Sequence, residues 1–87
     1  MTFISENVIP GNHGRVFTID VKREIDLDRV KNKLMKLHAI SSVIINNEVY
    51  PVEMTIQTDR VIAVKTIQEV MNSMGFHAIP KEGFFEI

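Results

Sequence analysis

Apolar and polar residues alternate along residues 15–22, where Phe17, Ile19 and Val21 take every second position. A period of two is typical of a β-strand that buries one face. From Asp26 onward the apolar positions follow the spacing of an amphipathic α-helix, and they are Leu27, Val30, Leu34 and Leu37. The pattern therefore predicts a strand that is followed closely by a helix.

Two further strands are predicted in the middle of the chain. The apolar run at residues 39–45 indicates one strand, and residues 52–58 indicate another because their apolar side chains share one face. Asn46 and Asn47 are expected to form the turn between them. Pro51 cannot donate a hydrogen bond to a β-ladder, so we expect it at a strand start, a bulge or an edge.

The rest of the pattern predicts a second helix and a fourth strand. Helical spacing of apolar residues runs from about residue 60 to Met74, and Gly75 follows where helices commonly end with a positive φ. Residues 76–79 then supply a short strand, which Pro80 is expected to stop.

This order of elements predicts an α+β fold. Strand, helix, strand, strand, helix, strand suits a ferredoxin-like βαββαβ sandwich, in which a four-stranded antiparallel sheet carries two helices on one face. The length allows a single domain, which we expect at residues 15–80, with residues 1–14 as an N-terminal extension and residues 81–87 as a C-terminal tail. Phe84 and Phe85 are expected to pack back onto the domain.

The composition excludes several classes of function. The chain has no cysteine, so it has no disulfide, no thiolate ligand and no sulfur nucleophile. A formal net charge of −1 argues against general nucleic-acid binding, and the apolar runs are too short to cross a membrane. Because the start of the chain shows no secretory signal pattern, a cytoplasmic location is expected.

Three short stretches resemble a known family. Val30 and Leu34 lie in the first predicted helix, residues 37–43 read Leu-His-Ala-Ile-Ser-Ser-Val, and residues 75–78 read Gly-Phe-His-Ala. The latter two resemble the Leu-x-Gly-Val-x-x-Val and Gly-Tyr-x-Ala patterns of heavy-metal-associated domains, the small modules of copper chaperones and metal-pumping ATPases. The resemblance covers residues 15–80 and implies a ferredoxin-like fold and a connection with heavy-metal transport or homeostasis.

That family holds its metal in a Met-x-Cys-x-x-Cys loop between the first strand and the first helix. At the matching positions this chain has Arg23 and Asp26 where the family has its two cysteines, and Val21 at the preceding apolar position. The resemblance therefore implies a non-enzymatic module that has lost the thiolate site, holds no cofactor and works through protein contacts.

The acidic residues around the start of the first helix allow two interpretations. Asp26 is the expected N-cap, and Asp28 suits the positive end of the helix dipole. Alternatively, carboxylates and an imidazole could bind a hard cation such as Mg²⁺ or Mn²⁺, because right-handed crossovers place residues 75–77 beside this turn. The candidate ligands are Glu24, Asp26, Asp28 and His77. A metal-ion or small-ligand domain with His, Asp and Glu ligands is thus the alternative function. His13 and His38 form another conceivable pair but lack a third ligand.

Six of the ten basic residues are concentrated in one short segment, and they are Lys22, Arg23, Arg29, Lys31, Lys33 and Lys36. A solvated helix face is the simplest explanation for such a cluster. A local positive patch also attracts acidic partners, and chaperones of the resembling family dock on acidic domains through a similarly placed surface. We therefore predict an acidic protein partner. A homodimer through a sheet edge or the open sheet face is a further possibility.

No enzymatic constellation is recognisable. The serines lie in no nucleophile-elbow context, and Gly11 and Gly14 precede a strand, whereas a phosphate-binding loop follows one. Acylphosphatases share the predicted fold and use an arginine in the first loop, where this chain has Arg23, but their glycine-bearing anion loop is missing here. We therefore expect no enzyme activity.

Overall fold

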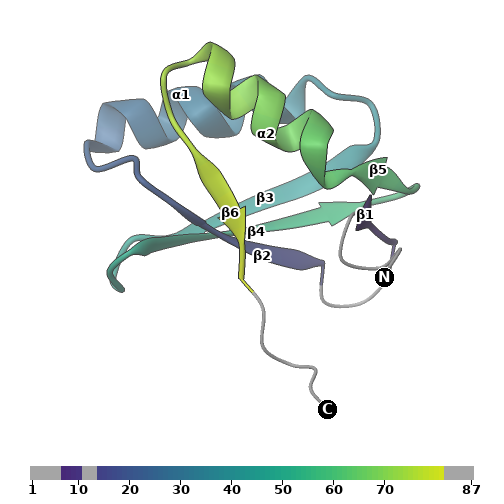
Figure 1. Cartoon of the computed structure of the whole chain (residues 1–87), viewed down its shortest axis with the longest axis horizontal. Coiled ribbons are helices and arrows are strands. Elements are labelled where there is room, and N and C mark those ends of the chain that lie inside the picture. The colour runs from purple at the N-terminus through teal and green to yellow at the C-terminus, as the bar shows by residue number, and fades with distance from the viewer. Residues whose placement is uncertain (1–6, 11–13, 82–87) are drawn as a thin grey trace.

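The computed structural model describes residues 7–10 and 14–81. The expectations for His13, Phe84 and Phe85 fall outside these residues. Along the described chain the elements are β1 Asn7–Val8, β2 Arg15–Ile19, α1 Glu24–Met35, β3 Ile40–Asn46, β4 Val52–Thr58, β5 Ile62–Ala63, α2 Val64–Ser73 and β6 Ala78–Pro80 (Figure 1).

Four of the strands form one antiparallel sheet with the order β3-β4-β2-β6. Both helices lie on the same side of this sheet (Figure 1), with α1 packed on β3 and α2 packed on β6. The predicted α+β class, the two helices and the four-stranded antiparallel sheet are therefore confirmed. A second sheet of two strands, β1 and β5, was not predicted.

The core lies between the helices and the sheet, at the positions that the periodicity predicts. Phe17 and Ile19 of β2 and Val21 just after it are buried, as are Val52, Met54 and Ile56 of β4. On the helices the buried residues are Leu27, Val30 and Leu34 of α1 and Val64, Ile67 and Met71 of α2. Burial of one such side chain typically stabilises a fold by about 1.5–3 kcal/mol, which is why the periodic positions decide the architecture.

The N-terminal segment contributes to this core, although the sequence pattern suggested an extension. Asn7 pairs with Ala63 and Val8 pairs with Ile62, and the side chain of Val8 is fully buried. Because Ile62 and Ala63 are extended in this pairing, α2 begins at Val64 and not near residue 60.

Two turn predictions also need correction. Pro80 does not stop the last strand but belongs to it, opposite Phe17, because β6 is an edge strand and the missing N–H of proline removes no ladder bond there. The connection between β3 and β4 spans residues 47–51, longer than the predicted Asn-Asn pair, and the side chain of Asn46 accepts the backbone N–H of Glu48 at 3.1 Å.

Candidate functional site

The first helix, α1, begins at Glu24, before Asp26, the residue that was expected to cap it. Arg23 is the N-cap, with an extended backbone, and its carbonyl accepts the backbone N–H groups of Asp26 and Leu27. The prediction that Asp26 caps the helix is therefore wrong, because Asp26 already lies within the first turn. Its carboxylate instead accepts a hydrogen bond from Nε of Arg23 at 3.0 Å and lies 3.9 Å from the guanidinium of Arg29. The hydrogen bond that Arg23 donates to Asp26, together with the negative charge of that carboxylate, raises the pKa of Arg23.

The four candidate metal ligands are not brought together. Asp26 is engaged by Arg23 and Arg29, and Glu24 and Asp28 are exposed on the first turns of α1. His77 is held by a different carboxylate, that of Asp20. Within residues 7–10 and 14–81, no group of three His, Cys, Asp or Glu side chains could hold a metal ion.

The bond between Asp20 and His77 joins the end of β2 to the loop before β6. Oδ1 of Asp20 accepts the backbone N–H of His77 at 2.8 Å, and Oδ2 lies 3.0 Å from the ring Nδ1. Partial desolvation on its own raises the pKa of Asp20, but the hydrogen bonds and the charge of His77 together outweigh it, so the pKa lies below its ordinary value. Sequence reasoning expected these two segments to be neighbours but did not identify Asp20 as the partner.

The loop that carries His77 is fixed by the C-terminus of α2. Gly75 has φ +88°, and its N–H bonds to the carbonyl of Asn72, while the N–H of Phe76 reaches the carbonyl of Met71. This pair of bonds is the Schellman motif, which needs a residue that tolerates positive φ. The glycine stop predicted from the sequence is therefore confirmed, and it sets the position of Met74 beside α1.

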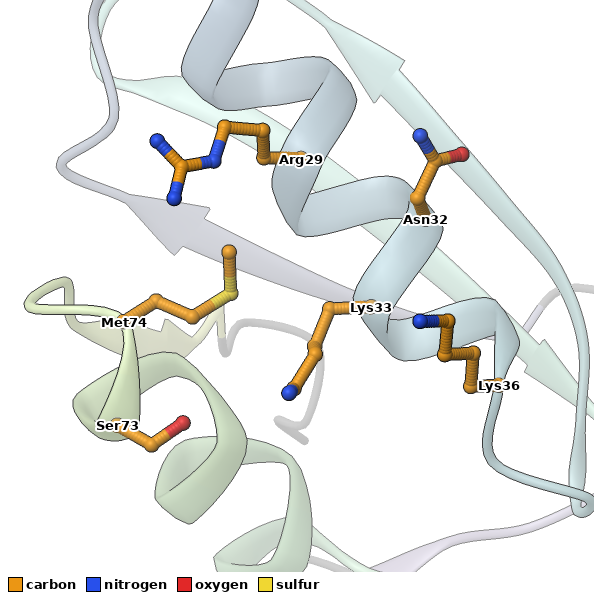
Figure 2. Close-up of a pocket in the computed structure, with 6 residues that line it drawn as sticks. All are labelled: Arg29, Asn32, Lys33, Lys36, Ser73 and Met74. Carbon is orange, nitrogen blue, oxygen red and sulfur yellow. The ribbon is translucent and has the colours of Figure 1, made fainter.

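A groove of about 500 Å³ opens between α1 and the end of α2 (Figure 2). Its lining residues are Arg29, Asn32, Lys33 and Lys36 from α1 and Ser73 and Met74 from α2. The side chains of Arg29, Lys33 and Met74 project into the space between the two helices, as Figure 2 shows. Among the residues that the structure describes, no acidic side chain lines the groove, so the lining combines three cations with an amide, a hydroxyl and a thioether.

The six basic residues that were predicted to form the partner-binding surface fall into three sets in the structure. Arg29, Lys33 and Lys36 line the groove together. Lys31 lies on the other flank of α1, because successive residues turn by about 100° around a helix. Lys22 and Arg23 are exposed in the loop before α1. The spacing of 29, 33 and 36 along one helix face could have identified the groove set before the structure.

Three groove residues were missed by sequence reasoning. Asn32 lies between the basic positions, and Ser73 and Met74 come from a helix far away in the sequence. The only sequence signal for the latter two was the glycine stop at Gly75, which marks the end of α2 and thus the part of it that lies beside α1.

No protein-family model matches this chain, and no curated protein or solved structure matches it at a significant level. Within the described part of the chain, neither helix has the length and apolar character needed to cross a membrane. The residues of the groove and their geometry are therefore the basis for the function proposed below.

Proposed function

We propose that this chain is a non-enzymatic interaction module with a ferredoxin-like fold, and that it binds an acidic segment of a partner protein in the groove between α1 and α2. The observation that carries the proposal is the lining of that groove. Arg29, Lys33 and Lys36 come together there, and within residues 7–10 and 14–81 no acidic side chain joins them. The ligand chemistry that such a surface favours is a set of carboxylates.

The charge of the groove contrasts with that of the chain. The whole sequence has 11 acidic and 10 basic residues, so positive charge is concentrated locally and not in excess overall. Of the three groove cations, Arg29 is partly neutralised by Asp26 at 3.9 Å, whereas Lys33 and Lys36 form no ion pair within the described residues. Such a patch speeds the encounter with an acidic partner and makes binding sensitive to salt.

Other polar and apolar groups favour a peptide over a simple ion. The amide of Asn32 can donate and accept hydrogen bonds at the groove, and Ser73, whose hydroxyl donates to the carbonyl of Val70 at 2.6 Å, can accept one. Met74 adds a flexible apolar side chain that adapts to varied partners. A groove between two helices also has the shape that accommodates an extended or helical segment. We therefore propose an acidic peptide segment that includes an apolar residue.

The strand order β3-β4-β2-β6, with both helices on one face, supports the ferredoxin-like part of the proposal. The resemblance of residues 15–80 to heavy-metal-associated domains supports a connection with metal transport or homeostasis. Because Arg23 and Asp26 form an ion pair where that family has thiolates, we propose that the chain contributes protein contacts and not metal transfer.

The experiment measures the binding of a fluorescent oligoglutamate peptide that contains one leucine, by anisotropy at low and at physiological salt. The groove variant Lys33→Glu/Lys36→Glu is compared with Lys31→Glu/Lys65→Glu, which makes the same change in net charge on residues outside the groove. We expect the groove variant to weaken binding by roughly tenfold or more, since two favourable charge contacts become repulsive. The control variant should retain binding within a few-fold. Equal losses in both variants would contradict the proposal.

A further inference from the structure

The outer edge of β3 is an open strand edge of unusual character. Among the described residues β3 has one neighbour, β4, although it is seven residues long. Its sequence, ISSVIIN, contains no charged residue and no proline. Natural sheets commonly protect their edges with lysine, proline or short strands, because an unpaired edge is a template for another strand. A β-bulge between Ile40 and Ser42 is the only irregularity of its register with β4.

The opposite edge of the same sheet is protected. β6 has three residues, and one of them is Pro80, which has no N–H to offer a neighbouring strand. The edge strand β6 therefore carries the protection that edge strands commonly have, whereas the edge strand β3 does not.

Apolar side chains lie on both sides of the β3 edge. On the open face of the sheet, the side chain of Ile44 is 53% exposed. On the helix side, Met35 of α1 is 42% exposed. Met35 lies on the flank of α1 that faces away from the groove, since about 100° separates successive residues. That flank lies above the β3 edge of the sheet, because α1 packs on β3, whereas α2 packs on β6 at the opposite edge.

We propose that β3 pairs antiparallel with β3 of a second copy of this chain, to form a twofold dimer with a continuous eight-stranded sheet. Antiparallel pairing about a twofold axis makes an edge complementary to itself. His38 lies two residues before β3 and Glu48 lies two residues after it. In-register pairing therefore places each histidine beside the partner copy's acid at both ends of the interface.

The helices fit this arrangement as well. A helix is about 10–12 Å wide and strands lie about 4.8 Å apart, so one helix covers roughly two strands. Pairing of the two β3 edges consequently brings the two α1 helices side by side, and their exposed Met35 side chains are covered. The flank that meets the partner also carries Asp28 and Lys31, whose opposite charges suit an antiparallel helix pair.

The dimer does not depend on the function proposed above. The groove lies on the opposite flank of α1, so an acidic segment and a second copy can bind at the same time.

Sedimentation equilibrium across a wide concentration range tests the dimer. The unmodified chain should approach twice its monomer mass. Ile44→Lys should shift it to monomer, because lysine side chains of the two copies meet near the centre of the paired strands. The matched control is Ile79→Lys on β6, which places the same charge on the same open face at a position that is 62% exposed. This control should remain dimeric, and circular dichroism confirms that both variants are folded.

A second measurement locates the interface directly. Because the chain has no cysteine, a single one can be introduced without competing sulfur. Ile44→Cys should form a covalent dimer with a short bis-maleimide at low protein concentration, and Ile79→Cys should not. A chain that stays monomeric at every concentration would overturn the proposal. So would a dimer that Ile79→Lys dissociates and Ile44→Lys leaves intact.

Discussion

Asp20 holds His77 at two points, with one carboxylate oxygen on the backbone N–H at 2.8 Å and the other on the ring Nδ1 at 3.0 Å. These residues are 57 positions apart, and their bond ties the end of β2 to the loop that follows α2. Met74 ends α2 just before this loop and lines the groove together with residues of α1. The contact therefore holds the end of α2 in the place where it forms one wall of the groove.

The first prediction concerns acid stability. The pKa of Asp20 is lowered in the folded chain, so its charged form stabilises the fold above the unfolded pKa of about 3.9. That contribution is lost as the pH falls through the lower, folded pKa. Asp20→Asn should consequently reduce the free energy of unfolding at pH 7 and flatten its decline below about pH 5.

The measurement is urea unfolding at a series of pH values, with Glu69→Gln as the matched control. Glu69 is exposed on α2, so this variant removes one carboxyl charge without touching the Asp20–His77 contact. If the free energy of unfolding of Asp20→Asn changed with pH in parallel with that of the unmodified chain, the Asp20–His77 contact would not contribute to the loss of stability in acid.

The second prediction compares two glycines with positive φ. Gly14 has φ +69°, and a Cβ there would lie 2.5 Å from the carbonyl oxygen of Ile56. Gly75 has φ +88°, but a Cβ there meets nothing within 4 Å. Both alanine variants carry the cost of a left-handed backbone, about 1–2 kcal/mol, and only Gly14→Ala adds a clash with a strand backbone. Gly14→Ala should therefore unfold at clearly lower denaturant than Gly75→Ala. Equal denaturant midpoints for the two variants would show that the backbone of β4 moves away at Ile56 without a loss of stability.

The third prediction concerns the N-terminal segment. Val8 is fully buried, whereas its neighbour Ile9 is 42% exposed. Val8→Ala removes two buried methyl groups and leaves a cavity, so it should lower the free energy of unfolding by about 2 kcal/mol. Ile9→Ala should change it by well under half of that. Thermal or urea unfolding measures both, and an equal small effect would mean that β1 is not part of the cooperative domain.

The sequence predicts the elements with long periodic patterns and fails where the pattern is short. Phe17, Ile19 and Leu27 lie where the pattern places them because burial of one face imposes a period. β1 and β5 have two residues each, too few to show any period, and only their mutual pairing makes them strands. Residue preference also misplaced the helix start, since Arg23 supplies the carbonyl that begins α1 although aspartate is the commoner cap.

The candidate site follows the same division. Residues on a single helix could be placed together from their spacing, as with Arg29, Lys33 and Lys36. For residues on elements far apart in the sequence, the predicted topology gives only the end of the sheet at which they meet and not which side chains are in contact. Topology placed His77 near the start of α1, but the choice between Asp20 and Asp26 as its partner depends on side-chain directions that no periodicity encodes.

The last prediction concerns metal binding at the start of α1. Asp26 has Arg23 at 3.0 Å and Arg29 at 3.9 Å, so a cation that approached its carboxylate would have to displace two guanidinium groups. Divalent cations held by oxygen ligands need several carboxylates or carbonyls at once, and like charges nearby weaken them further. Isothermal titration with Mn²⁺ and with Zn²⁺ should therefore show no saturable heat, and Asp26→Asn should behave in the same way. A stoichiometric heat that Asp26→Asn abolishes would favour the metal-binding alternative over the interaction module.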